Sequence, residues 1–300
     1  MTAPSLHHSF DASLVDIQRS FSSTETATSG SSGKENQRPE PTPTRLTKEL
    51  TTSELYTQWA TTYDTDGNFL QAVDDLQTSA LIPQLVRQVE LSKSSNGPNG
   101  GLKVLDFGCG TGRTTTKLLL QDWKETPTIE AWDGNEAMLD GARAKCEAIS
   151  KVSSKGIPSS EFRQVDFLQP DKLPQEALAS FDGLVSTLVL EHIPMSTYWT
   201  CVSKLLKPGG FGLITNMHPE MGAKSVAGFD NVEGVRMRGT SYIHGVEETV
   251  EAAKKAGLEL VGEVKEVTMS EDMIRSGAVG ERGRKWIGTK VWYGSIFRKL

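Results

Sequence analysis

The feature that most limits the possible fold is a regular alternation of strand-like and helical segments between residues 101 and 218. The strand-like segments are LKVLDF, TIEAWD, EFRQVDF, FDGLVSTLVL and FGLITNM, and amphipathic stretches separate them. Strands that alternate with helices at this spacing pair in parallel through right-handed crossovers, with helices on both faces of the sheet. The fourth segment is apolar along most of its length, as expected for a strand that is buried on both faces.

The C-terminal part follows a different order. HGVEETVEAAKKAG predicts a helix, and LELVGEVKEVTMS and TKVWYGSIFRKL predict two strands. No full-length helix separates these two strands, so we expect an antiparallel pair joined by an excursion over residues 270–288. The expected fold class is therefore α/β: a doubly wound, three-layer sandwich with a mostly parallel, seven-stranded sheet and an antiparallel final strand.

The N-terminal residues differ from the rest in composition. Residues 22–44 contain no aromatic side chain and almost nothing apolar, so this segment cannot bury enough surface to offset the entropy of ordering it. We therefore expect a disordered tail over residues 1–46 and one domain over residues 47–300. Apolar residues at helical spacing predict helices over residues 47–98, which we interpret as a lid before a core over residues 101–218.

Composition excludes several classes of protein. The net charge of −6 gives no electrostatic footprint for nucleic acid, and no apolar run approaches the roughly 18 residues of a membrane span. The three cysteines, Cys109, Cys146 and Cys201, lack metal-ligand spacing and fit a reducing cytoplasm. The short basic run RGRKW, residues 282–286, is interpreted as a solvated face. The sequence does not indicate an oligomeric state.

A glycine-rich turn follows the first predicted strand. In KVLDFGCGTGR the glycines stand at alternate positions, Gly108, Gly110 and Gly112. Glycine tolerates positive φ and has no Cβ, so the backbone can approach a ligand closely. A strand, such a turn and a helix N-terminus form a ligand site in open α/β sheets. The dinucleotide fingerprint G-x-G-x-x-G would need its third glycine where Arg113 stands, which disfavours a dehydrogenase.

The acid-bearing form DFGCGTG resembles the glycine-rich motif of class I S-adenosylmethionine-dependent methyltransferases. IEAWDGNEAML, FRQVDF, FDGLVSTLVLEHIP and LLKPGGFGLITN are similar to later motifs of the family's small-molecule branch, in the family's order. The resemblance covers residues 100–217. It implies a Rossmann-like fold, S-adenosyl-L-methionine as cofactor, a small-molecule acceptor and methyl transfer by in-line displacement, with no metal.

The resemblance also implies roles for individual residues. The three glycines would let the backbone approach the methionine moiety and its ribose, while Asp106 would orient the turn or bind the amino group. Asp133 would accept both ribose hydroxyls. Its alternative role is to cap the next helix, for which Asn135 is better placed.

The adenine is expected at the end of the third predicted strand, between Asp166 and Phe167, with Met138 beside it. Core packing is the alternative role of both apolar residues. The full set of cofactor-binding residues implied by the resemblance is Tyr63, Asp106, Gly108, Cys109, Gly110, Gly112, Asp133, Gly134, Met138, Asp166, Phe167 and Leu188.

The acceptor is expected among long connections at the C-terminal strand ends, which fall mainly within residues 219–288. His192 is the first candidate to position or deprotonate the acceptor; its alternative role is packing against the cofactor or the turn. His218 and His244 are alternative bases. The aromatic side chains of ELYTQWATTYD, residues 54–64, are expected either to close over the cofactor or to pack in the core.

Three other functions compete with this interpretation. A DNA or RNA substrate is disfavoured by the acidic charge and by the absence of an N-P-P-Y-like signature after the fourth strand. A cofactor-binding regulatory protein and a protein methyltransferase remain as alternatives. Deleting residues 1–46 distinguishes a small-molecule methyltransferase from a regulatory protein. If the chain is such an enzyme, activity on a small acceptor should survive the deletion.

Overall fold

A computed structural model describes residues 46–96, 101–153 and 156–300, so most of the expected tail lies outside the described residues. The main sheet has seven strands in the order β4-β3-β2-β5-β6-β10-β9. All its neighbouring strands are parallel except β10, which is antiparallel to both β6 and β9. This confirms the expected fold class and the antiparallel final strand. The strands are β2 (Lys103–Phe107), β3 (Thr128–Asp133), β4 (Ser159–Gln164), β5 (Phe181–Thr187), β6 (Leu206–Met217), β9 (Leu258–Thr268) and β10 (Lys290–Lys299).

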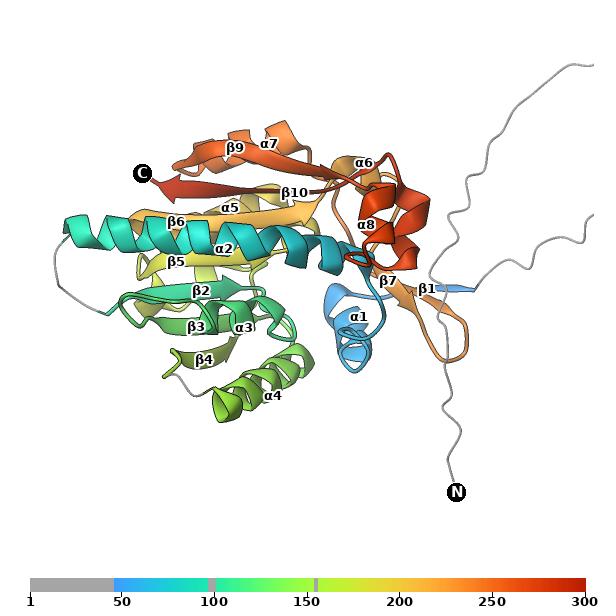
Figure 1. Cartoon of the computed structure of the whole chain (residues 1–300), viewed down its shortest axis with the longest axis horizontal. Helices are drawn as coiled ribbons and strands as arrows, with labels where there is room; N and C mark the ends of the chain where they lie inside the picture. The colour runs from blue at the N-terminus through green and yellow to red at the C-terminus, as the bar shows by residue number, and fades with distance from the viewer. Residues whose placement is uncertain (1–45, 97–100, 154–155) are drawn as a thin grey trace, which may run out of the picture.

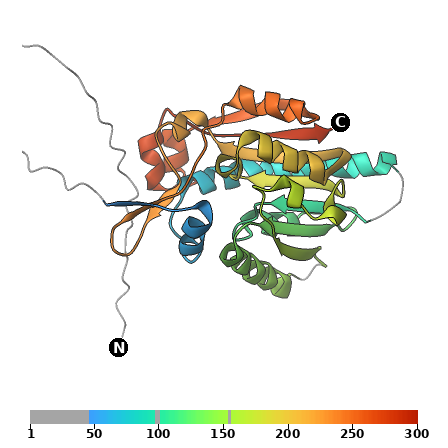
Figure 2. The ribbon, with the colours of Figure 1, turned by 180° about the vertical axis from the view of Figure 1, so that it is seen from behind.

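Helices cover both faces of this sheet (Figures 1 and 2). Helices α2, α3 and α4 pack on one face, and α5 and α7 pack on the other. The helices are α1 (Thr52–Trp59), α2 (Phe69–Asn96), α3 (Arg113–Leu119), α4 (Glu136–Val152), α5 (Met195–Leu205), α6 (Pro219–Gly222), α7 (Val246–Lys255) and α8 (Glu271–Arg275). The short 3-10 helices are η1 (Pro170–Lys172), η2 (Gln175–Ala177), η3 (Leu190–His192) and η4 (Glu281–Trp286).

The central strands are buried on both faces, which explains their apolar sequences. In β2, Val104 contributes to the core under α2, whereas Leu105 contributes to the core under α5. Leu184 and Val185 of β5 alternate in the same way. Successive side chains of a strand point to opposite faces, so two separate cores form from one continuous apolar run.

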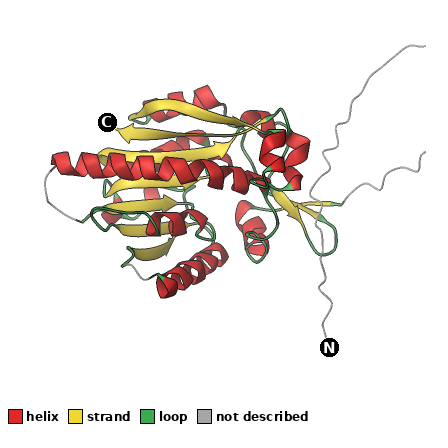
Figure 3. Cartoon of the chain, in the orientation of Figure 1, coloured by secondary structure: helices red, strands yellow, loops and turns green. Residues whose placement is uncertain are grey.

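The region before β2 differs from the expected helical lid in two respects. Residues Thr47–Glu49 form a strand, β1, which pairs in parallel with β8 (Arg236–Arg238). Strand β8 also pairs with β7 (Gly228–Asp230), giving a small three-stranded sheet beside α1 (Figure 3). Helix α2 packs along β5, β6 and β10 and supplies apolar side chains to the core, so it is a layer of the sandwich.

Within the described residues, no helix is both long and apolar enough to cross a membrane.

Candidate functional site

The glycine turn after β2 adopts the backbone that its sequence requires. Gly108, Gly110 and Gly112 have φ values of 74°, 53° and 81°, all in the left-handed region that favours glycine. A Cβ on Gly108 would lie 2.4 Å from a methyl group of Val189, and one on Gly112 would lie 3.0 Å from Cα of Ala142. A Cβ on Gly110 would meet nothing within 4 Å. Gly110 therefore faces open space, whereas the other two glycines allow close packing.

Asp133 ends β3 and faces this turn. One carboxylate oxygen accepts a hydrogen bond from the Gly110 amide at 2.8 Å, and the other accepts from the Asn135 amide at 2.9 Å. Removal from solvent raises the pKa of Asp133 to about 6, although these amides partly oppose the shift. Asn135 is the N-cap of α4, since its side chain accepts from the Met138 amide. Asp133 is therefore not needed as the N-cap of α4.

A cavity of about 430 Å³ opens above the turn, and we call it the first cavity. Most of the residues predicted to bind the cofactor line it. These are Tyr63, Gly108, Cys109, Gly110, Asp133, Gly134, Met138, Asp166, Phe167 and Leu188. The cavity is thus built from the carboxyl ends of β2, β3 and β5, from residues that follow β4, and from the segment around α1.

Two predicted residues lie outside the lining of this cavity. Asp106 is fully buried, and its carboxylate accepts a hydrogen bond from the Thr115 hydroxyl at 2.6 Å. Burial raises its pKa to about 7. Of its two predicted roles, this placement favours orienting the turn over contacting a ligand's amino group. Gly112 packs against Ala142 of α4, so it brings α3 and α4 together without forming cavity wall.

The apolar wall residues serve the cavity and the core at once. Phe167 stacks on Phe107 with ring centroids 3.9 Å apart, and it is 6% exposed. Met138 is 1% exposed on the inner face of α4. Each of these side chains can therefore line the cavity, where the adenine was predicted, and pack in the core at the same time.

Polar contacts hold α1 and the turn after it against this site. The side-chain amide of Asn135 donates to the Ser53 carbonyl at 2.9 Å and to the Thr57 hydroxyl at 2.7 Å. Asp64 accepts from the Thr111 hydroxyl at 2.6 Å and pairs with Lys145 of α4 at 2.8 Å. These contacts place Tyr56 and Tyr63 in the wall of the first cavity.

A second cavity of about 560 Å³ adjoins the first. The two share Tyr56, Tyr63 and Leu188 as wall residues. Leu188, directly after β5, has a φ of 57°, a strained backbone for a branched residue. The other aromatic and acidic or basic residues that line the second cavity are Trp59, Asp66, Phe69, Glu191, Arg236, Glu281, Arg282, Arg284, Lys285 and Trp286.

The interpretation of residues 282–286 as a solvated face is therefore wrong for part of this run. Trp286 is buried and stacks with Phe69 at a centroid distance of 6.0 Å. Arg282 donates to the Asp66 carbonyl and lines the second cavity. The excursion between β9 and β10 folds back over the site, which a local charge pattern does not reveal.

The three candidate histidines occupy different places. His192 lines the first cavity, and its Nε2 lies 2.8 Å from the Tyr56 hydroxyl. Burial lowers the pKa of His192 to about 4, so the imidazole is neutral at physiological pH. With Nδ1 3.5 Å from the Thr240 carbonyl, the fitting tautomer carries its proton on Nδ1 and accepts from Tyr56 at Nε2.

His218 and His244 line neither cavity. His218 caps α6 by accepting from the Glu220 amide at Nδ1, while Nε2 lies 2.7 Å from the Glu266 carboxylate. His244 is buried with Nε2 3.1 Å from two main-chain carbonyls of the η3 turn. Both imidazoles are engaged in structural contacts, and the structure does not bring either one into the site.

Sequence reasoning missed Glu191, although it is adjacent to His192 in EHIP. Glu191 is 6% exposed and lines the second cavity. Burial raises its pKa to about 8, although a hydrogen bond from the Met217 amide opposes the shift. The signal was present in the sequence, because LVLEHI places one acid in an otherwise apolar run.

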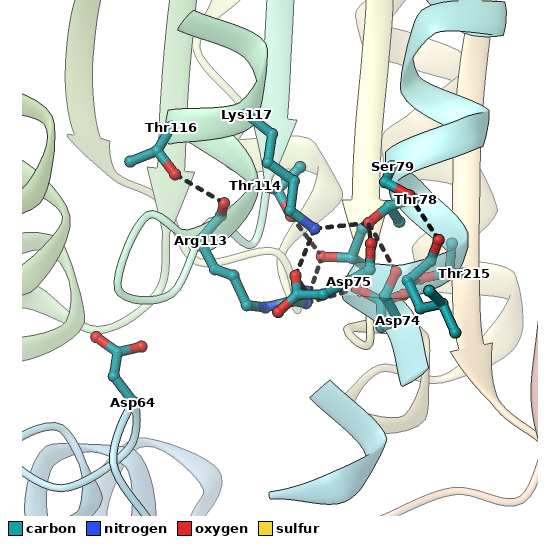
Figure 4. A network of polar contacts seen from close by, with 12 residues as sticks. Asp64, Asp74, Asp75, Thr78, Ser79, Arg113, Thr114, Thr116, Lys117 and Thr215 are labelled. Carbon is teal, nitrogen blue, oxygen red and sulfur yellow. Dashed lines mark hydrogen bonds and ion pairs between the residues drawn. The ribbon is translucent and has the colours of Figure 1, made fainter. Parts of the chain in front are cut away.

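Arg113 was also missed as a site residue. Its guanidinium lines the first cavity and pairs with Asp74 at 2.7 Å and with Asp75 at 2.6 Å (Figure 4). Asp74 is fully buried and also accepts from the hydroxyl of Thr215 and the indole of Trp292. The sequence signal for this network was the pair of adjacent acids, Asp74 and Asp75, within the otherwise helical apolar pattern AVDDLQ.

Comparisons with known proteins agree on one family. A model described as a methyltransferase domain matches residues 104–210. The chain is 40% identical over 259 residues to an uncharacterized methyltransferase of Emericella nidulans, covering 81% of this chain and 89% of the relative. It is 26% identical over 150 residues to the human mitochondrial ubiquinone biosynthesis O-methyltransferase, covering 50% of this chain and 37% of that protein.

A solved structure shares the fold. It is a candidate sarcosine dimethylglycine methyltransferase from Galdieria sulphuraria, with a TM-score of 0.50 and 15% identity, covering 75% of this chain and 86% of that chain.

Proposed function

Because the chain belongs to the class I S-adenosylmethionine-dependent methyltransferase family, we propose that it transfers a methyl group from S-adenosyl-L-methionine to a small molecule held in the second cavity. The observation that carries the proposal is that the two cavities share one wall of Tyr56, Tyr63 and Leu188. A methyl donor on one side and an acceptor on the other would meet at this wall.

The first cavity fits the donor. Gly110 leaves open space where a Cβ would stand, so a ligand can approach the bare backbone. Asp133 uses one backbone amide on each oxygen, and a carboxylate has about four acceptor sites, so capacity remains for two ribose hydroxyls. Phe167 and Met138 provide an apolar wall for the adenine, and Asp166 lies beside them.

When bound, the donor supplies an electrophilic methyl group on a sulfonium. The protein's own contribution is alignment of the two reactants and exclusion of water, which can lower a barrier by about 7–11 kcal/mol when the geometry is good. Tyr56 and Tyr63 close the shared wall, and the hydrogen bond between Tyr56 and His192 fixes the orientation of that phenol. We therefore assign His192 the role of positioning Tyr56, which differs from the predicted role of positioning or deprotonating the acceptor directly.

A small-molecule acceptor is supported by the size of the second cavity, about 560 Å³, and by the name of the ubiquinone biosynthesis relatives. The lining of the second cavity combines aromatic rings with charged side chains, which suits a flat body that also carries polar groups.

Asp133→Ala tests the donor site. We expect the variant to lose calorimetric binding of S-adenosylhomocysteine by a factor of roughly 100, since two charge-assisted hydrogen bonds would be lost. Asp140→Ala is the control, because Asp140 lies on α4 near the site but is 73% exposed and lines neither cavity. Unchanged affinity in Asp133→Ala would contradict the assignment, and methyl transfer from labelled donor to a metabolite panel would identify the acceptor.

A further inference from the structure

We propose that Glu191 is the catalytic proton acceptor for a phenol-like hydroxyl acceptor bound in the second cavity. The inference rests on the proposed function and adds to it a residue, a reacting group and a substrate class. It follows from where the Glu191 carboxyl lies, from what its two oxygens contact and from what surrounds it.

The backbone of Glu191 is held firmly. It lies in the η3 turn after β5, at the edge of the sheet where the site is built. Its amide donates to the Asn216 side chain at 3.2 Å, and its carbonyl accepts from the Tyr242 amide at 2.7 Å. The second of these contacts is main chain to main chain. Contacts from two distant segments thus fix the residue beside the shared wall.

The two carboxylate oxygens differ in their contacts. Oε2 accepts from the Met217 amide at 3.3 Å. Oε1 accepts no hydrogen bond from the described residues, and the nearest ring nitrogen, Nε2 of His192, is 3.7 Å away. That nitrogen is already engaged by the Tyr56 hydroxyl at 2.8 Å. Oε1 is therefore available to a ligand in the second cavity.

The surroundings suit this carboxyl to proton transfer. The ionisable groups near it on the packed elements and in the second cavity are Tyr56, Tyr63, Asp66, Asp74, His192, Arg236, Glu281, Arg282, Arg284, Lys285 and Tyr293. Within the described residues no cationic side chain pairs with Glu191, because the imidazole of His192, 3.7 Å from Oε1, is neutral. Burial raises the pKa of Glu191 to about 8, closer to the value of about 10 for a phenol than an ordinary carboxyl would be.

The reaction balances without a further reagent. The acceptor oxygen forms a bond to the methyl carbon while the S–C bond breaks and its electron pair passes to sulfur. The hydroxyl proton moves to Oε1 of Glu191, which later releases it to solvent. Trp59, Phe69 and Trp286 line the same cavity and provide flat apolar surfaces for an aryl ring.

The test uses the full chain, Glu191→Gln and Glu191→Asp, with Glu266→Gln as the matched control. Glu266 is an acid near the site that contacts His218 and lines neither cavity. The probes are catechol, phenol, 4-nitrophenol and thiophenol, each assayed with labelled donor between pH 6 and 9. Calorimetry with S-adenosylhomocysteine and thermal unfolding check the donor site and the fold of each variant.

In the unaltered protein, kcat/KM for phenol and catechol should rise with pH and level off above about pH 8. Glu191→Gln should lower it by roughly 100-fold or more and abolish the rise, because general base catalysis contributes about this much. The loss should be smaller for the more acidic 4-nitrophenol and smallest for thiophenol, whose thiolate forms readily near neutral pH. Glu191→Asp should recover part of the phenol activity, and Glu266→Gln should match the unaltered protein.

Two results would overturn the inference. One is an equal loss for all four probes in Glu191→Gln, which indicates a structural role. The other is a lack of methylation of every hydroxyl probe by the unaltered protein. If the unaltered protein instead fails to bind S-adenosylhomocysteine, the proposed function itself is wrong, so the two failures are distinguishable.

Discussion

Three glycines with the same left-handed backbone serve different purposes in the turn after β2. Gly108 and Gly112 are required by protein neighbours, the side chain of Val189 and the backbone of Ala142. Gly110 has no protein atom within 4 Å of its Cβ position, so its bare surface faces the first cavity. The alternate spacing in the sequence predicted a close approach, but it could not tell which glycine serves a ligand and which serves packing.

Gly110→Ala and Gly112→Ala separate these purposes. Gly110→Ala should cost about 1–2 kcal/mol of stability, the cost of the left-handed backbone alone, and should weaken donor binding. Gly112→Ala should cost more, because its Cβ would also press on Ala142 at 3.0 Å. Urea unfolding and calorimetry with S-adenosylhomocysteine measure the two effects. Equal stability of the two variants would contradict the distinction.

The site residues show the same division between what a sequence can and cannot predict. Asp133 was predicted because IEAWDGNEAML resembles the family's second strand, which ends in an acid. The exclusion of Asp106 from the cavity depends on a hydrogen bond to Thr115, and the exclusion of His218 depends on a strand-to-turn contact with Glu266. Such contacts follow from packing between elements, which no local pattern encodes.

At the scale of elements, the ion-pair network of Arg113 joins the glycine turn to the rest of the sheet. Arg113 begins α3 and pairs with Asp74 and Asp75 of α2 (Figure 4). Asp74 in turn accepts hydrogen bonds from Thr215 of β6 and Trp292 of β10. Lys117 of α3 also contacts Asp75. The wall of the first cavity is thereby tied to three separate elements.

Arg113→Met should therefore destabilise the protein strongly. It leaves the carboxylate of Asp74 buried without its cation, and breaking a buried pair from one side costs about 3–5 kcal/mol. Arg143→Met is the control, because Arg143 pairs with exposed acids on α4 and such pairs contribute about 0–1 kcal/mol. Chemical denaturation followed by circular dichroism measures both. A loss in Arg113→Met no larger than in the control would show that the network does not support the fold.

The elements themselves were largely predictable from the sequence. Apolar runs indicated the central strands of the main sheet, whereas β4, with the sequence SSEFRQ, was indicated by its place in the alternation of strands and helices. Strand β1 has three exposed residues without periodicity, and its partner begins at Arg236, far along the chain. Its existence depends on pairing and not on its own sequence. The packing of α2 on the sheet was likewise not anticipated, because it depends on contacts with strands that are distant in the sequence.

For the whole molecule, the most consequential electrostatic feature is a set of three poorly solvated carboxyls around the site. Removal from solvent raises the pKa of Asp106 to about 7, of Asp133 to about 6 and of Glu191 to about 8. In the unfolded chain these groups ionise near their ordinary values of 3.8 and 4.5. The folded protein therefore holds protons that the unfolded chain has already lost.

The contribution of these carboxyls to the free energy of unfolding is fully present below about pH 4. It is lost as pH rises through their pKa values in the folded protein, because between the unfolded and folded pKa values the unfolded state binds fewer protons. Replacing Glu191 with Gln removes one contribution. The stability of Glu191→Gln relative to the unaltered protein should therefore increase from pH 6 to 8, by at most about 1.4 kcal/mol per pH unit. Urea unfolding across this range measures the difference.

Glu266→Gln provides the comparison for this experiment. The pKa of Glu266 is lowered, first by its hydrogen bond from Lys290, so its contribution changes only in acid. The difference in free energy of unfolding between Glu266→Gln and the unaltered protein should stay constant between pH 6 and 8. A flat difference for Glu191→Gln as well would show that Glu191 is ionised throughout this range.

The position of β10 between β6 and β9 affects how the chain must be assembled during synthesis. Both neighbours of β10 are translated before it, and it pairs with each of them. A chain that has folded without residues 290–299 leaves two strands with unsatisfied backbone groups, where an ordinary edge strand would leave one. The sheet is therefore completed by insertion of β10 between two strands and not by extension at an edge.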